Sequence, residues 1–138
     1  MNELMLSLLL WIGDHSAYNA NLTLPNLVRT EQSNLCQQYG INQKDRCQAQ
    51  RLAGFFDKNT TIYMRISYDL DDIHHQSQLL HELVHYVQWA NQKKDGHYCL
   101  GLIEVEAYDL QDQWRKQHGL QPVLSDFNRL MLEASCEA

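Results

Sequence analysis

The sequence predicts a single-domain α+β fold in which helices predominate. A length of 138 residues fits one domain and leaves no room for separate cofactor and substrate domains. With 6 glycines and 2 prolines, the chain has few of the residues that tight turns require. Apolar residues recur at helical spacing in several segments, whereas the best strand pattern is a single short run of β-branched and aromatic residues.

The first half of the chain contains one clear helix pattern. Residues 2–12 are expected to form an amphipathic helix whose apolar face includes Leu4, Leu8, Trp11 and Ile12. The apolar stretch from Leu4 to Ile12 could instead belong to a signal peptide, but Glu3 is the only charge before it, and the expected Lys or Arg is missing. A second helix is predicted over residues 27–39, ending before Gly40, and residues 41–58 give no assignment.

The second half contains the best strand and three further helices. Residues 60–66 (TTIYMRI) predict the strand, and residues 75–92 and 102–118 predict two helices, the second with Gly119 as a C-cap. Ser125 is the expected N-cap of a last helix. The apolar faces of these three helices would carry Leu80, Leu83, Val84 and Val87; Ile103, Ala107, Leu110 and Trp114; and Phe127, Leu130, Met131 and Ala134.

The charge balance argues against two kinds of partner. Lys and Arg total 11 against 17 for Asp and Glu, a net charge of -6. This is unfavourable for a protein that binds nucleic acid by neutralising phosphates, and for electrostatic anchoring to a membrane. No apolar run reaches the roughly 18 residues of a membrane span. The sequence leaves the oligomeric state open.

The four cysteines suggest a compartment. No two form a C-x-x-C pair, so a zinc ribbon is disfavoured. Cys36 and Cys47 flank a polar loop and are the more plausible disulfide pair, and a second bridge between Cys99 and Cys136 would tie the C-terminal segment to the middle of the chain. Such bridges favour a periplasmic or secreted protein, whereas four reduced thiols in a cytoplasmic protein are the alternative.

The sequence His81-Glu82-Leu83-Val84-His85 carries the strongest functional signal. Two histidines at i and i+4 project from one side of a helix, where their imidazoles can bind one metal ion. Glu82 lies about 100° around the helix and can reach a metal-activated water without being a ligand. The alternative is a helix with two solvated or capping histidines.

A third ligand is available on the next predicted helix. Eighteen residues separate His85 from Glu104, and a carboxylate there completes a His₂Glu set with an open fourth position, as in catalytic zinc sites. Ala107, one turn after Glu104, is small enough for the two helices to approach closely. Glu106 is the rival third ligand.

H-E-x-x-H followed about 18 residues later by E-x-x-A resembles the gluzincin clan of zinc metallopeptidases. The resemblance covers residues 60–118, and the short chain is similar to minigluzincins. The strings at residues 81–88 (HELVHYVQ) and 104–111 (EVEAYDLQ) also resemble small, uncharacterised bacterial proteins, several of them apparently exported. Residues 1–138 would then form one zincin-like metallopeptidase domain, with an active-site helix, a glutamate helix and a small sheet whose edge strand, residues 61–66, aligns a bound peptide.

The resemblance implies a role for each residue of the motif. His81, His85 and Glu104 would bind one Zn²⁺, and Glu82 would act as general base, taking a proton from the attacking water and delivering it to the leaving amine. The protein would hydrolyse peptide bonds in a peptide or protein substrate. The alternative is a zinc-binding, non-proteolytic module that retains the fold.

The sequence departs from the clan in one respect and leaves two further roles open. Many gluzincins place Asp or Asn four residues after the ligand Glu, where it orients a ligand His; here that position is Tyr108, whose hydroxyl or the neighbouring Asp109 would have to substitute. An acidic run (Asp69, Asp71 and Asp72) either favours basic substrate residues or stabilises a helix N-terminus. The candidates for an electrophile are Tyr63, Tyr68, Tyr98, His97 and His118.

Overall fold

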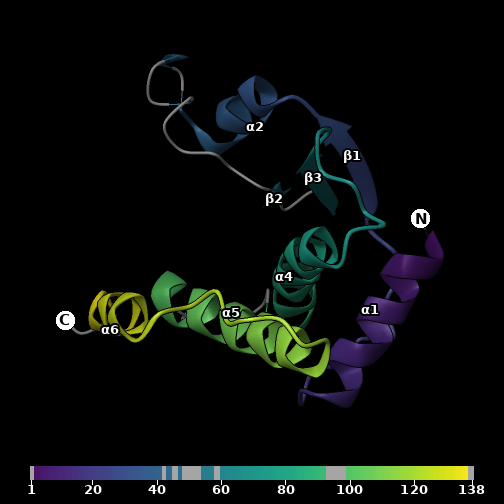
Figure 1. Ribbon diagram of the computed structural model, residues 1–138, viewed down its shortest axis with the longest axis vertical. Coiled ribbons are helices and arrows are strands. Elements are labelled where there is room, and N and C mark those ends of the chain that lie inside the picture. Colours follow the sequence, from purple (N-terminus) through teal and green to yellow (C-terminus); the bar gives the residue numbers. More distant parts are fainter. Residues whose placement is uncertain are drawn as a thin grey trace.

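The computed structural model describes residues 2–41, 43–44, 47, 54–57, 60–92 and 99–136, and within them it is a mainly helical α+β fold. The elements are α1 (Asn2–Asp14), β1 (Asn26–Thr30), α2 (Gln32–Tyr39), β2 (Gly54–Asp57), β3 (Thr61–Arg65), α4 (Ile73–Gln92), α5 (Leu100–Gln117) and α6 (Asp126–Ala134). In Figure 1 the sheet lies on one side of α4, α1 runs beside α4, α5 crosses it, and α6 lies against the end at which α5 begins.

The described strands form one sheet in the order β1-β3-β2. β1 runs parallel to β3, with Asn26 opposite Thr61, and β2 runs antiparallel to β3, with Gly54 opposite Met64. The strand predicted at residues 60–66 is therefore confirmed. The expectation that this strand is an edge strand is wrong, because β3 pairs on both sides. The antiparallel edge strand is β2, which packs against α4.

The helix predicted over residues 27–39 is correct only in its second part. Residues up to Thr30 belong to β1, and α2 begins at Gln32. The Val and Thr of this segment suit a strand, and pairing with β3 provides the hydrogen bonds that decide its conformation. The predicted end at Gly40 is confirmed: Gly40 has φ +89°, and the next residue, Ile41, donates its N–H to the Cys36 carbonyl at 2.7 Å.

The core is built around α4. Its predicted apolar stripe is fully buried, and it packs with β3 and α1 on its two sides. On α1 the buried face is turned slightly from the predicted one, since Leu4 and Trp11 are only partly buried. The main buried residues of these three elements are Leu79, Leu80, Leu83, Val84 and Val87 on α4, Ile62 and Met64 on β3, and Met5, Leu8, Leu9 and Ile12 on α1.

The last helix, α6, is attached to α5 in a different way. Ser125 caps it as predicted, accepting a hydrogen bond from the Asn128 N–H at 3.1 Å. Its predicted apolar face is not buried, because Phe127, Leu130 and Met131 are 56–68% exposed. Three other contacts join α6 to α5. The backbones approach closely at Gly101, where a Cβ would lie 2.2 Å from the Leu132 carbonyl oxygen, and Arg129 forms an ion pair with Asp109. A disulfide joins Cys99, just before α5, to Cys136, just after α6.

Both predicted cysteine pairs are disulfide-bonded. Cys36 is joined to Cys47 and Cys99 to Cys136, each with Cα atoms 5.6 Å apart. Four reduced thiols, the alternative from the sequence, are therefore not what the structure contains. Among the described helices, none combines the length and apolar character that a membrane crossing requires.

Candidate metal centre

The three residues predicted as metal ligands converge on one point. His81 and His85 lie one turn apart on α4, and their Nε2 atoms are 3.2 Å apart. Glu104 reaches them from α5: its Oε1 is 3.5 Å from Nε2 of His81 and forms an ion pair with Nε2 of His85. One ligand atom from each residue lies within 4.8 Å of the other two. His81 is buried, and the Glu104 side chain is 35% exposed, so the cluster is open to solvent on the glutamate side.

Local packing explains this convergence. Leu83 and Val84, between the two histidines in sequence, are fully buried and orient α4 on the core. Ala107 is also fully buried, and its small side chain suits the close packing of α5 on α4 that the sequence predicts. The histidines therefore lie at the margin of the helix contact, where Glu104 can reach both of them.

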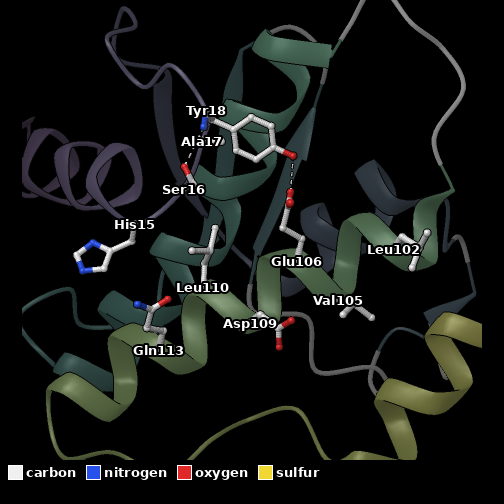
Figure 2. Close-up of a pocket in the computed structure, with 10 residues that line it drawn as sticks. All are labelled: His15, Ser16, Ala17, Tyr18, Leu102, Val105, Glu106, Asp109, Leu110 and Gln113. Atoms are coloured by element: carbon white, nitrogen blue, oxygen red, sulfur yellow. Dashed lines mark hydrogen bonds between the residues drawn. The ribbon is translucent and has the colours of Figure 1, made fainter.

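Glu106, the rival third ligand, is engaged elsewhere. Its Oε1 accepts a hydrogen bond from the Tyr18 hydroxyl at 2.5 Å and another from Nε2 of Gln88 at 2.8 Å. Figure 2 shows the Tyr18 and Glu106 side chains meeting at the first of these bonds. Of the two glutamates considered, the structure brings Glu104 to the histidine pair.

Each histidine ring contacts a glutamine through its Nδ1 atom, and neither glutamine was predicted from the sequence to have this role. Nδ1 of His81 lies 3.0 Å from Oε1 of Gln111, and Nδ1 of His85 lies 2.9 Å from Oε1 of Gln88. Because an amide oxygen can only accept, each Nδ1 donates and Nε2 is the atom left for a metal. The available signal was spacing: Gln88 follows His85 by one turn, and Gln111 follows Glu104 by two turns.

The substitutes considered from the sequence have other contacts. The Tyr108 ring packs against the His81 ring, with centroids 4.5 Å apart. Asp109 forms an ion pair with Arg129 of α6. The support that many gluzincins place four residues after the ligand Glu is provided for His81 by Gln111 instead.

Charge at the cluster favours an ion pair in the metal-free protein. Burial lowers the pKa of His85, but the hydrogen bond to Glu104 and the charges of Glu82 and Glu104 raise it more, to about 9. Burial raises the pKa of Glu104, but hydrogen bonds from His81 and His85 and their charges hold it well below its ordinary value. At neutral pH, His85 is therefore a cation beside the Glu104 carboxylate. The half-buried Glu82 is close enough for its charge to contribute.

A family model described as "Domain of unknown function (DUF6647)" matches residues 1–138. The chain belongs to the DUF6647 family. No curated protein and no solved structure matches it. The family description assigns no function to DUF6647, so the functional argument rests on the residues and their geometry.

In this DUF6647 chain, binding of a divalent cation is expected to release a proton from His85. The metal competes with the proton for Nε2, so apparent zinc affinity should rise about tenfold per pH unit from pH 7 to the His85 pKa of about 9, and then level off. Calorimetry at pH 7 in two buffers of different ionisation enthalpy should show at least one proton released per zinc, because any ionisation of a zinc-bound water adds to the proton from His85. An affinity that stays constant from pH 7 to 9 would contradict this assignment.

The remaining predicted residues have varied positions. Tyr68 stacks on His75 and His118 stacks on Trp114, with ring centroids 4.1 and 3.9 Å apart. Tyr63 lies on β3, whereas Tyr98 and His97 lie outside the described residues, so the electrophile stays a prediction. The acidic run caps α4, since Oδ1 of Asp72 accepts from the His74 N–H at 2.7 Å; this supports the interpretation as a helix N-terminus.

A separate pocket of about 520 Å³ lies between α5 and the segment that follows α1. Figure 2 shows its lining, which includes Tyr18, Glu106 and Gln113 but none of the three candidate ligands. By helix geometry, Glu106 and Gln113 lie on the flank of α5 roughly opposite Glu104. The pocket therefore does not include the histidine pair, although Glu106 in its lining contacts Gln88, which in turn contacts His85.

Proposed function

We propose that the protein is a gluzincin-type zinc metallopeptidase that hydrolyses peptide bonds. His81, His85 and Glu104 would hold one zinc ion, and Glu82 would act as general base. The observation that carries the proposal is the meeting of Glu104, from a second helix, with the Nε2 atoms of both histidines of the H-E-x-x-H motif. The motif is defined by local spacing, and a carboxylate from α5 joins it as a His₂Glu site requires.

The donor set fits zinc. Two imidazole nitrogens and one carboxylate oxygen are the ligands of a well-known class of catalytic zinc site, and such a set leaves a position for water and substrate. The glutamine at each Nδ1 matches the outer contacts that ligand histidines usually make. When bound, zinc lowers the pKa of a water molecule toward about 7 and polarises the scissile carbonyl.

The protein's own acid–base group would then be Glu82. It follows His81 on α4, so helix geometry places it beside the histidine pair rather than within it. Its half-buried carboxylate would accept a proton as water attacks the carbonyl and would donate that proton to the leaving amine.

The arrangement of elements supports a zincin-like core. In this proposal α4 is the active-site helix, α5 is the glutamate helix, and β2 rather than β3 is the edge strand that aligns a bound peptide. As the antiparallel edge strand packed on α4, β2 has one backbone edge outside the described sheet pairing, and an extended peptide can add to such an edge. The two disulfides further support an oxidising compartment, and we propose a periplasmic or secreted location.

Reconstitution with zinc followed by digestion of a peptide library tests the proposal. We expect one zinc ion per chain, a higher melting temperature with zinc than with chelator, and cleavage that chelation abolishes and zinc restores. A His85→Ala variant is the matched control for both metal and cleavage. Failure of the disulfide-intact protein to bind zinc would overturn the proposal. Full occupancy without cleavage of any library peptide would favour the non-proteolytic zinc-binding module.

A further inference from the structure

We propose that Gln88 and Glu106 are positioning residues for His85: Glu106 holds the Gln88 amide, and that amide holds the imidazole with Nε2 directed at the metal position. The inference rests on the proposed function only in taking His85 as a metal ligand. Neither residue is a defined position of the H-E-x-x-H or E-x-x-A motif. Each acts through another residue rather than on a substrate.

The Gln88 amide has one favourable orientation. Gln88 is 2% exposed, so its amide atoms need partners within the protein. Its Nε2 donates to the Ile103 carbonyl at 3.1 Å and to Oε1 of Glu106 at 2.8 Å, while its Oε1 accepts from Nδ1 of His85 at 2.9 Å. Rotation of the amide by half a turn would set its oxygen against two acceptors and its NH₂ against the Nδ1–H. The two acceptors therefore fix the proton on Nδ1.

Glu106 is itself held by a residue outside α4 and α5. The Tyr18 hydroxyl, in the segment after α1, donates to the same Oε1 that accepts from Gln88. A chain of hydrogen bonds thus runs from Tyr18 through Glu106 and Gln88 to His85. This gives Glu106 a role although it is not part of the metal cluster.

The second histidine is held by the same chemistry. The Ser77 hydroxyl donates to the His74 carbonyl, so its lone pairs face Nη1 of Arg115 and Nε2 of Gln111, at 2.8 and 3.4 Å. With its Nε2 directed at this acceptor, Gln111 presents its oxygen to His81. Both candidate histidine ligands are thus held by a neutral amide whose direction is set by a third group.

Histidine ¹⁵N chemical shifts and zinc affinity together test this chain of hydrogen bonds, which we call the relay. In the metal-free protein at alkaline pH, where the rings are neutral, His85 should carry its proton on Nδ1. In Glu106→Leu it should become a mixture with the Nε2–H form, and the zinc dissociation constant should rise about 10–100-fold. Glu106→Gln keeps an acceptor oxygen and should stay close to wild type. Asp109→Asn, on the same helix but paired with Arg129, should leave both measurements unchanged.

The relay is overturned if Glu106→Leu folds and retains both the Nδ1–H form of His85 and the wild-type zinc affinity. If Glu106→Leu does not fold, Tyr18→Phe removes a single hydroxyl from the chain of bonds and should change both measurements in the same direction by a smaller amount; wild-type values would then count against the relay. If the wild-type protein binds no zinc, the proposed function fails, and the ¹⁵N shifts of the metal-free protein still decide whether Glu106 positions His85.

Discussion

Replacing Glu82 by glutamine is expected to slow peptide cleavage by about 10²–10⁴-fold while one zinc ion remains bound per chain. Glutamine keeps the size of the side chain but cannot accept the proton of the attacking water. The three ligands are unchanged, so metal content should match wild type. Steady-state cleavage of the best library peptide, with zinc measured on the same sample, gives both quantities.

The Glu82→Gln variant carries a second expected change. The charge of Glu82 is one cause of the raised pKa of His85, so in Glu82→Gln the pH at which zinc affinity levels off should be lower than in the wild type. Glu31→Gln is the matched control, because it removes the same charge from an exposed residue that makes no side-chain cap on α2. Undiminished cleavage in Glu82→Gln would remove Glu82 from the proposed mechanism, whatever its metal content.

Replacing each of the two neighbouring glutamates by glutamine should affect zinc binding differently. Glu104→Gln replaces the carboxylate that meets both histidines, so zinc affinity should fall by more than the about 10–100-fold that loss of an outer contact costs. Glu106→Gln retains an oxygen that can accept from Tyr18 and Gln88, and its zinc stoichiometry should remain one. Competition with a chromophoric chelator measures both variants under the same conditions.

The pair of variants differs by two positions on one helix and is matched in size and charge change. Thermal unfolding without metal shows whether either substitution perturbs the fold. Retained zinc in Glu104→Gln together with loss in Glu106→Gln would reverse the assignment of the third ligand. That result would also require Glu106 to leave the Tyr18 and Gln88 contacts described above.

The elements that sequence predicted well are those whose pattern is local. The apolar stripe of α4 repeats over several turns, and the spacing from His81 to His85 is itself a helical repeat, so both could be read from consecutive residues. β1 could not be predicted in this way, because β3, the strand with which it pairs, is distant in the sequence. Its five residues also carry too little pattern to exclude a helix. The exposed face of α6 shows a further limit, since amphipathicity reveals an apolar face but not what covers it.

The residues of the candidate site likewise fall into two groups, those that a sequence pattern predicts and those that it does not. Glu104 was predicted because its distance from His85 and the position of Ala107 match a motif. The supports Gln88 and Gln111 were not, because a glutamine on a helix becomes an orienting group only through third partners such as the Ile103 carbonyl and Ser77. Those partners come from other turns and elements, which no short sequence pattern records.

The bridge between Cys99 and Cys136 has a consequence for the order in which the protein matures. Cys99 immediately precedes α5, and Glu104 lies five residues further on. Its bonding partner follows 37 residues later, after α6. The disulfide at the start of α5 can therefore form only after both α5 and α6 have been synthesised and the two cysteines have been exposed to an oxidant. Covalent fixing of this end of α5 is accordingly a late event, after α4 with its two histidines has already been made.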